Sequence, residues 1–286
     1  MAESSGNSKT LSSMEQENDI NYDCAADFVN ECVLEFRWTD LSNDLIMDVG
    51  CGHDFNCCNF ILKVFPDIKY LVAIDNDPSV FENADYIDER IYCCVGNIEE
   101  RETLLPFVGQ MDKIISTGTI DVISNKQLVF ENVYHLLKPG GEAAFLFTLN
   151  HCYYNFLTVL LEIPKFRKMF KGQYDPNMYP KERRGQYYKQ MLEEVGFHNV
   201  VSKVVEKKEP PPSDEDWKDI LYEEFKNMFK ISPHSVADIK EDLFQIYVTK
   251  IEKCKLKYMN RVLLLYLLGS KPISTFHSEV KQTTVL

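Results

Sequence analysis

The stretch Leu45-Ile46-Met47-Asp48-Val49-Gly50-Cys51-Gly52-His53-Asp54 decides the fold of this chain. It is a short apolar run that ends at an acidic residue and two alternating glycines. An amphipathic segment follows, with Phe55, Cys58, Ile61 and Phe65 at helical spacing. The pattern predicts a buried strand, a tight turn and the start of a helix, an arrangement that brings backbone N–H groups against a small ligand.

The rest of the chain alternates in the same way between apolar strands and amphipathic helices. We therefore expect an α/β fold with a parallel sheet that helices cover on both faces. Further strands are predicted at 70–74, 91–95, 111–116, 142–148, 200–205 and 261–268. Helices are predicted at 18–38, 55–65, from Pro78 onward, at 125–137, within 150–182, and at 185–195, 214–229 and 236–255.

Composition limits the domain organisation and the partners. Residues 1–17 are polar and are expected to be a disordered leader, 18–271 to form one domain, and 272–286 to be a flexible tail. The formal net charge of −13 argues against electrostatic wrapping of nucleic acid. The chain shows no secretory signal pattern and no apolar run long enough to span a bilayer, so we expect a cytoplasmic protein without membrane insertion, as a monomer or homodimer.

The nine cysteines show no spacing typical of a metal site or a redox motif. They include two adjacent pairs, Cys57-Cys58 and Cys93-Cys94, and no C-x-x-C. Most stand where a small apolar residue would serve. We therefore expect reduced core thiols and no metal.

Polar and small residues gather where the first four strands end. In an open parallel sheet, ligands bind outside these carboxyl ends. Asp75 follows Gly52 at the spacing expected for a carboxylate that accepts both hydroxyls of a ribose, and Asn97 is placed to hydrogen-bond an adenine edge. The predicted cofactor-binding residues are Asp48, Gly50, Cys51, Gly52, Asp75, Asn76, Gly96, Asn97, Ile98, Ser116 and Thr117.

The charge of the glycine turn favours one cofactor over another. Asp48 and Asp54 flank the turn, and two carboxylates would repel the pyrophosphate of NAD. A cofactor that carries an ammonium and a sulfonium tolerates them well. We therefore predict S-adenosylmethionine, and an NAD-dependent dehydrogenase is the alternative that NAD binding would support.

These residues resemble the class I S-adenosylmethionine-dependent methyltransferases. The resemblance rests on the turn at 48–54, on Asp75, on residues 96–98, and above all on Leu136-Leu137-Lys138-Pro139-Gly140-Gly141. The sequence is most similar to the arthropod juvenile hormone acid methyltransferase family, with further matching features at Trp38 and 192–197.

The resemblance implies a Rossmann-like, seven-stranded, mostly parallel sheet whose last strand is antiparallel. It also implies a helical lid, built from about 18–38, 150–182 and 210–255, over an apolar acceptor pocket. The family methylates the carboxylate of farnesoic or juvenile hormone acids and related fatty acids.

Three positions depart from the pattern of that family. Asp54 replaces the third glycine of the turn, where we expect it to cap the following helix. Asn97 stands where an acid is usual. Ile120-Asp121-Val122 replaces a Leu-His-Trp run whose Trp contacts the acceptor carboxylate in the family. These changes leave cofactor binding better supported than specificity for a farnesoid acid.

The predicted function is O-methylation of a small apolar carboxylic acid. A carboxylate needs no general base, so catalysis would rest on positioning and exclusion of water. For a hydroxyl or amine acceptor, Asp121 or His151 would supply a base. The alternative is a catalytically degenerate scaffold that binds cofactor weakly or binds only a partner. The residues expected to line the acceptor pocket are Tyr22, Trp38, Val122 and Tyr153.

Overall fold

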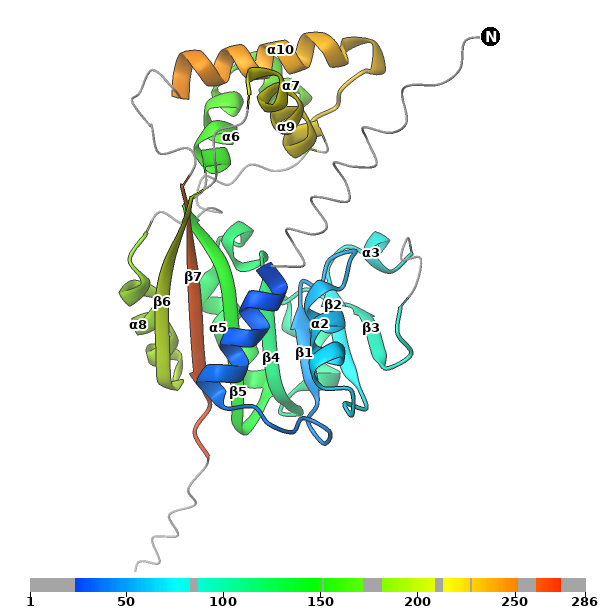
Figure 1. The fold of residues 1–286 in the computed structure, drawn as a ribbon, viewed down its shortest axis with the longest axis vertical. Coiled ribbons are helices and arrows are strands. Elements are labelled where there is room, and N and C mark those ends of the chain that lie inside the picture. The colour runs from blue at the N-terminus through cyan, green and yellow to red at the C-terminus, as the bar shows by residue number, and fades with distance from the viewer. Residues whose placement is uncertain are drawn as a thin grey trace, which may run out of the picture.

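A seven-stranded sheet forms the centre of the molecule, and a group of helices lies beyond one end of it (Figure 1). The computed structural model describes residues 24–82, 87–150, 152–171, 182–208, 213–226, 228–251 and 261–273. The strands are β1 Ile46–Val49, β2 Leu71–Asp75, β3 Ile91–Val95, β4 Met111–Thr117, β5 Leu137–Asn150, β6 His198–Lys208 and β7 Arg261–Ser270.

The strand order is β3-β2-β1-β4-β5-β7-β6. The pairs among β1 to β5 are parallel, whereas β7 runs antiparallel to both β5 and β6. This topology confirms the predicted mostly parallel sheet with an antiparallel last strand. It also places the ends of β1 and β4 side by side, at the edge of the sheet where an open α/β fold binds ligands.

Helices cover both faces of the sheet. A helix over residues 24–36, α2 Asn56–Val64 and α3 Ser79–Glu82 pack on one face. On the other face lie α5 Lys126–Leu136 and α8 Gly185–Val195, with α4 Arg101–Leu104 beside them. The inner strands β1 and β2 are therefore buried on both sides, which explains their nearly continuous apolar sequence, whereas the edge strand β3 leaves Tyr92 and Val95 exposed.

A second helical group, which we call the helical cap, has a core of its own. It contains α6 Cys152–Glu162, α7 Pro164–Met169, α9 Asp214–Lys226 and α10 Val236–Ile246, followed by a π-helical turn at Tyr247–Ile251. Its buried side chains include Phe156, Phe166, Phe225 and Phe229. Figure 1 shows the cap beyond the carboxyl end of β5. The segments 150–182 and 210–255 thus lie where a lid was predicted, and closure over an acceptor stays a prediction.

The N-terminal helix packs differently from the lid that the resemblance implied. Its Phe28 contacts Tyr266 of β7, with ring centroids 6.3 Å apart, and Glu31 pairs with Lys203 of β6 at 2.7 Å. Residues 24–36 therefore lie along the face of the sheet. Only the first turn, with Cys24 and Ala25, reaches the pocket described below.

Several element boundaries differ from the predicted ones, most clearly at β5 and α10. β5 begins directly after α5, because Leu137 already pairs with Met111 before the register shifts around 138–141. The helix predicted over 236–255 keeps α-helical geometry only to Ile246. The predicted leader at 1–17 and the tail beyond 273 lie outside the described residues. No helix in the described part of the chain is both long and apolar enough to cross a bilayer.

Candidate functional site

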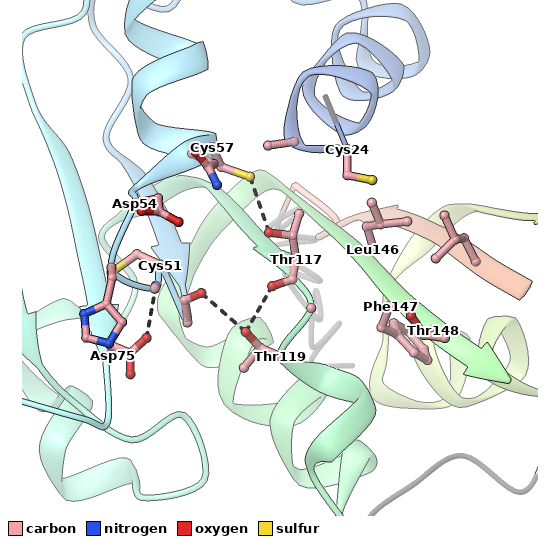
Figure 2. Close-up of a pocket in the computed structure, with 17 residues that line it drawn as sticks. Cys24, Cys51, Asp54, Cys57, Asp75, Thr117, Thr119, Leu146, Phe147 and Thr148 are labelled. Atoms are coloured by element: carbon pink, nitrogen blue, oxygen red, sulfur yellow. Dashed lines mark hydrogen bonds between the residues drawn. The ribbon is translucent and has the colours of Figure 1, made fainter. Parts of the chain in front are cut away.

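A pocket of about 480 Å³ opens at the carboxyl ends of β1, β4 and β5 (Figure 2). The glycine turn at 50–54 and Asp75 form one wall. Residues 117–119 and 146–148, with Leu264 of β7, form the opposite one. Cys24 and Ala25 close it from the start of the N-terminal helix. The sequence therefore predicted the wall made by the turn and by Asp75.

The glycine turn adopts backbone angles that only glycine takes without strain. Gly50 has φ +72° and Gly52 has φ +63°, both in the left-handed region. The N–H of Gly50 donates to the carbonyl of Ile74 at 2.8 Å, which fixes the turn against β2. A Cβ atom on Gly52 would meet no atom within 4 Å, so this position faces open space and leaves room for a ligand.

Asp75 is held in place by two backbone donors. The N–H of Gly52 donates to its Oδ2 at 3.2 Å, a contact drawn in Figure 2, and the N–H of Asp77 donates to Oδ1 at 3.0 Å. Each carboxylate oxygen keeps acceptor capacity, because it can accept more than one hydrogen bond. The half-buried carboxylate is thus fixed in orientation at the pocket and keeps the capacity to accept further hydrogen bonds.

Asp48 lies behind the turn and is almost completely buried, with 2% of its surface exposed. The thiol of Cys58 donates to its Oδ2 at 3.3 Å, and among the described residues Oδ1 has no hydrogen-bond partner. Burial raises the pKa of Asp48 to about 7; the Cys58 thiol opposes this shift and the charge of Asp75 adds to it. A positive charge bound in the pocket would favour the ionised form.

Thr119 joins β4 to the glycine turn, a role that the sequence analysis did not assign. Its Oγ1 lies 3.2 Å from the carbonyl oxygen of Thr117, 3.4 Å from that of Gly50 and 3.5 Å from that of Val49. The hydroxyl donates to one of them at a time. The small-residue run Thr117-Gly118-Thr119 after β4 was the available signal, since Gly118 with φ +62° turns Thr119 toward the turn.

The wall opposite Asp75 combines apolar and hydroxyl side chains. Leu146, Phe147 and Leu264 supply its apolar part, beside Thr117, Thr119 and Thr148. Cys57 also lines the pocket, with its Sγ 3.5 Å from Oγ1 of Thr117, and burial raises its pKa. Seven cysteines of the described part of the chain are free thiols, as predicted. In the described part of the chain, no three side chains of His, Cys, Asp and Glu form a group that could hold a metal ion.

Trp38 does not line the pocket, so its assignment as an acceptor residue was wrong. Its indole N–H donates to Oε2 of Glu142 at 2.7 Å, and Nζ of Lys113 lies 5.1 Å from the ring centroid. Lys113 and Glu142 stand near the starts of β4 and β5. The N-terminal helix therefore positions Trp38 at the end of the sheet opposite the pocket.

Asp121 and Val122 lie in a short 3-10 helix, Ile120–Val122, and neither lines the pocket. The side chain of Asp121 is 7% exposed and contributes to the electrostatic environment of Lys126, whose pKa burial lowers to about 8. The ammonium of Lys126 donates to the Asp121 carbonyl. The side chain of Val122 is 44% exposed. A base role for Asp121 stays a prediction without support from this geometry.

The structure separates the predicted cofactor residues into two sets. Gly50, Cys51, Gly52, Asp75 and Thr117 line the pocket. The remaining six, which do not line it, are Asp48, Asn76, Gly96, Asn97, Ile98 and Ser116.

Two of the residues outside the lining have clear structural contacts. The amide of Asn97 donates to Oε1 of Glu100 at 2.9 Å, and its Oδ1 accepts the N–H of Glu99 at 3.0 Å. The hydroxyl of Ser116 donates to the carbonyl of Val49 at 2.8 Å and links β4 to β1. The Asn97 side chain therefore stabilises the loop after β3, and Ser116 joins two strands whose ends carry the pocket.

Asp54 does not cap α2, contrary to the prediction. The helix begins at Asn56, its N-cap is Phe55 with φ +50°, and no side chain caps it. Asp54 instead lines the pocket, while its carbonyl accepts from the Asn59 amide at 3.0 Å. Tyr22, His151 and the side chain of Tyr153 lie outside the described residues.

Comparison with known proteins identifies the family. Residues 40–211, more than half of the chain, match the family described as a methyltransferase domain. The juvenile hormone acid O-methyltransferase of Drosophila melanogaster is 23% identical over 180 residues, covering 60% of this chain and 61% of that protein. The arsenite methyltransferase of Halobacterium salinarum is 26% identical over 108 residues, covering 35% of this chain and 26% of that protein. The matches span less than two thirds of either relative.

The fold comparison gives the same result. The crystal structure of a proposed sarcosine dimethylglycine methyltransferase from Galdieria sulphuraria aligns with a TM-score of 0.54 at 14% identity, over 88% of this chain and 86% of that one. At this identity the likeness shows a shared fold. Taken with the match over residues 40–211, it shows that the chain belongs to the methyltransferase-domain family, as its resemblance to class I S-adenosylmethionine-dependent methyltransferases predicted.

Proposed function

We propose that the pocket binds S-adenosylmethionine and that the chain transfers the methyl group to a carboxylate oxygen of a small apolar acid, of the farnesoid or fatty type. The observation that carries this proposal is the two-sided pocket. The glycine turn and Asp75 form its polar wall, and Leu146, Phe147 and Leu264 form its apolar wall.

The polar wall fits the cofactor. Asp75 would accept the two ribose hydroxyls, and the open space at Gly52 lets the ligand approach the backbone. Asp54 and Asp75 are acidic, and no lysine or arginine is among the described lining residues. A site of this charge suits a cationic ligand and disfavours the pyrophosphate of NAD. S-adenosylmethionine supplies an electrophilic methyl group when bound.

The apolar wall fits the acceptor. A carboxylate is already a nucleophile, so the protein needs to position it in line with the methyl group and to exclude water. Leu146, Phe147 and Leu264 would pack against the hydrocarbon part of such an acid and keep water from its reactive end. Similarity to juvenile hormone acid O-methyltransferase supports this acceptor class.

The cofactor and the acceptor are tested in sequence. Calorimetry with S-adenosylmethionine is expected to show binding, and NAD in the same experiment is expected to show none. Radiolabelled methyl transfer is then measured on farnesoid and fatty acids, phenols, amines and arsenite. Turnover on an acid supports the proposal. Turnover restricted to phenols, amines or arsenite would show that the acceptor belongs to another class, and it would leave the assignment of the cofactor unchanged.

A second candidate function is a methyltransferase scaffold without catalysis. It is favoured by Asp54, whose side chain lines the pocket at the position where the resembled family has a glycine and so takes up space next to the site of the cofactor. Absence of S-adenosylmethionine binding at millimolar concentration would establish this candidate over the enzyme.

A further inference from the structure

Two segments of the helical cap form a small extended pair. Phe170, directly after α7, makes an antiparallel bridge with Phe229, which follows α9. The N–H of Lys171 donates to the carbonyl of Met228 at 2.9 Å, and the N–H of Lys230 donates to that of Met169 at 2.7 Å. The bridge therefore fixes the register of the two segments.

This register places two lysines on the same side. Side chains alternate across extended backbone, so the residues flanking the bridge point away from the two bridged phenylalanines. Phe229 is 1% exposed and packs on Phe166 in the cap core, with ring centroids 5.6 Å apart. Lys171 and Lys230 are exposed on the other side. We call this surface the basic face.

Cations that lack carboxylate partners gather in the two segments that carry the basic face. Residues 163–171 hold four basic side chains and no acid, and residues 228–231 add Lys230 and no acid. All five cations are exposed, and Lys165 pairs with Asp242. Among the described residues, none of the other four lies within ion-pair distance of a carboxylate. These four are Arg167, Lys168, Lys171 and Lys230.

Two lysines elsewhere in the cap are paired with carboxylates. Lys218 lies 3.0 Å from a carboxylate oxygen of Glu215 and 3.1 Å from one of Glu241. Lys240 lies 2.6 Å from a carboxylate oxygen of Asp219. The four unpaired cations all lie within three residues of the bridged phenylalanines, in a chain whose net charge is −13.

Apolar side chains lie among these cations. Met169 and Met228 flank the bridge; both pack against the cap core and are half-buried, so each leaves part of its surface exposed. Ile163 and Ile231 are half-buried at the ends of the two segments. A surface that mixes lysines with partly exposed apolar side chains matches a bilayer interface, where the ammonium groups meet lipid phosphates and the apolar groups enter the headgroup region. A nucleic acid backbone would offer the methionines and isoleucines no comparable contact.

We propose that the basic face docks the protein on an anionic lipid bilayer. The negative charge of the rest of the chain repels such a surface, so contact is favoured only in the orientation that presents Lys171 and Lys230. This inference goes beyond the methyltransferase function, and it is tested without any turnover. A protein held in this way would have direct access to apolar acids that partition into membranes.

The test is co-sedimentation of the full chain with vesicles. Vesicles of phosphatidylcholine alone are compared with vesicles that also contain phosphatidylserine, at low and high salt. We expect binding only to the second kind, and loss of binding at high salt. The Lys171→Gln/Lys230→Gln variant should bind about thirtyfold more weakly, because each lysine contributes about fivefold near an anionic surface.

The matched control is Lys218→Gln/Lys240→Gln, which removes the same charge from the same cap. Its binding should stay within about twofold of the wild type, because those lysines are already paired. Thermal unfolding of both variants checks that they fold. Equal losses in the two variants, equal binding to neutral vesicles, or binding to single-stranded DNA with none to vesicles would overturn the proposal.

Discussion

The hydroxyl of Thr119 occupies the space that a Cβ atom on Gly50 would need, at a distance of 2.0 Å. The two residues come from the ends of β4 and β1, which pair in parallel. The contact locks the glycine turn to the neighbouring strand. Because of this contact, a larger residue at position 50 would need a smaller residue at position 119.

Gly50→Ala is expected to destabilise the protein by about 2–4 kcal/mol, because it adds a clash to an unfavourable positive φ. Chemical denaturation measures the loss. Thr119→Gly in the same chain should restore part of it by vacating the space, while the strain from φ remains. A double variant no more stable than Gly50→Ala would show that the clash is relieved elsewhere.

Asp75→Asn is expected to weaken S-adenosylmethionine binding by about 10- to 100-fold. The amide keeps one acceptor oxygen but loses the charge that strengthens hydrogen bonds to the ribose hydroxyls. Calorimetry measures the affinity. Asp77→Asn is the control, since that side chain is exposed, accepts from Ser79 and does not line the pocket. Similar losses in both variants would indicate a general effect of charge.

Asp48 should make the protein less stable as the pH rises from about 4 to 7. Its pKa is about 7 in the folded state and about 3.9 in an unfolded chain, so the folded state holds the proton more tightly in this window. Stability is then lost as the pH rises through the folded pKa. Asp48→Asn should remove this slope and be more stable than the wild type at pH 8, by a few kcal/mol at most. Unfolding at pH 5 and pH 8 tests it, and a variant with an unchanged slope would contradict it.

The same residue links cofactor binding to a proton. A cationic cofactor favours ionised Asp48, so binding at pH 6.5 should release a proton from it. The heat of binding would then differ between buffers of different ionisation enthalpy. Asp48→Asn should abolish the difference, and His53→Gln should keep it even though His53 lines the pocket. Identical heats in both buffers for the wild type would contradict the link.

Trp38→Phe is expected to lower stability by about 1–3 kcal/mol, because Glu142 loses a hydrogen-bond donor. The KM for the acceptor should not change, since Trp38 stands at the end of the sheet opposite the pocket. Denaturation and steady-state kinetics measure the two effects. A raised KM for the acceptor in a variant of unchanged stability would indicate that Trp38 lines the acceptor site after all.

The glycine turn and Asp75 were predictable because their positions follow from local pattern. A strand that ends in Asp48 and alternating glycines allows few conformations, and parallel pairing of β1 with β2 then brings Asp75 to Gly52. The seven strands follow from the same alternation. The antiparallel direction of β7 came only from the family resemblance.

The positions of Trp38 and Asp54 depend on geometry that the sequence does not display. Trp38 follows an amphipathic helix, and its position depends on the direction in which that helix crosses the sheet. Asp54 has the right chemistry for a cap, but Phe55 adopts a left-handed conformation and separates it from the helix start at Asn56. Thr119 was missed because its contact with Gly50 joins residues far apart in the chain.

The position of β7 between β5 and β6 has a consequence for how the protein is made. Residues 261–270 insert between β5 and β6 and hydrogen-bond to both. During translation, β5 is therefore available more than 100 residues before the strand that pairs with it, and the interval includes the whole helical cap. Until β7 leaves the ribosome, β5 and β6 each present an unpaired edge that is prone to aggregation. A nascent chain of this architecture would have a long window in which it depends on chaperones.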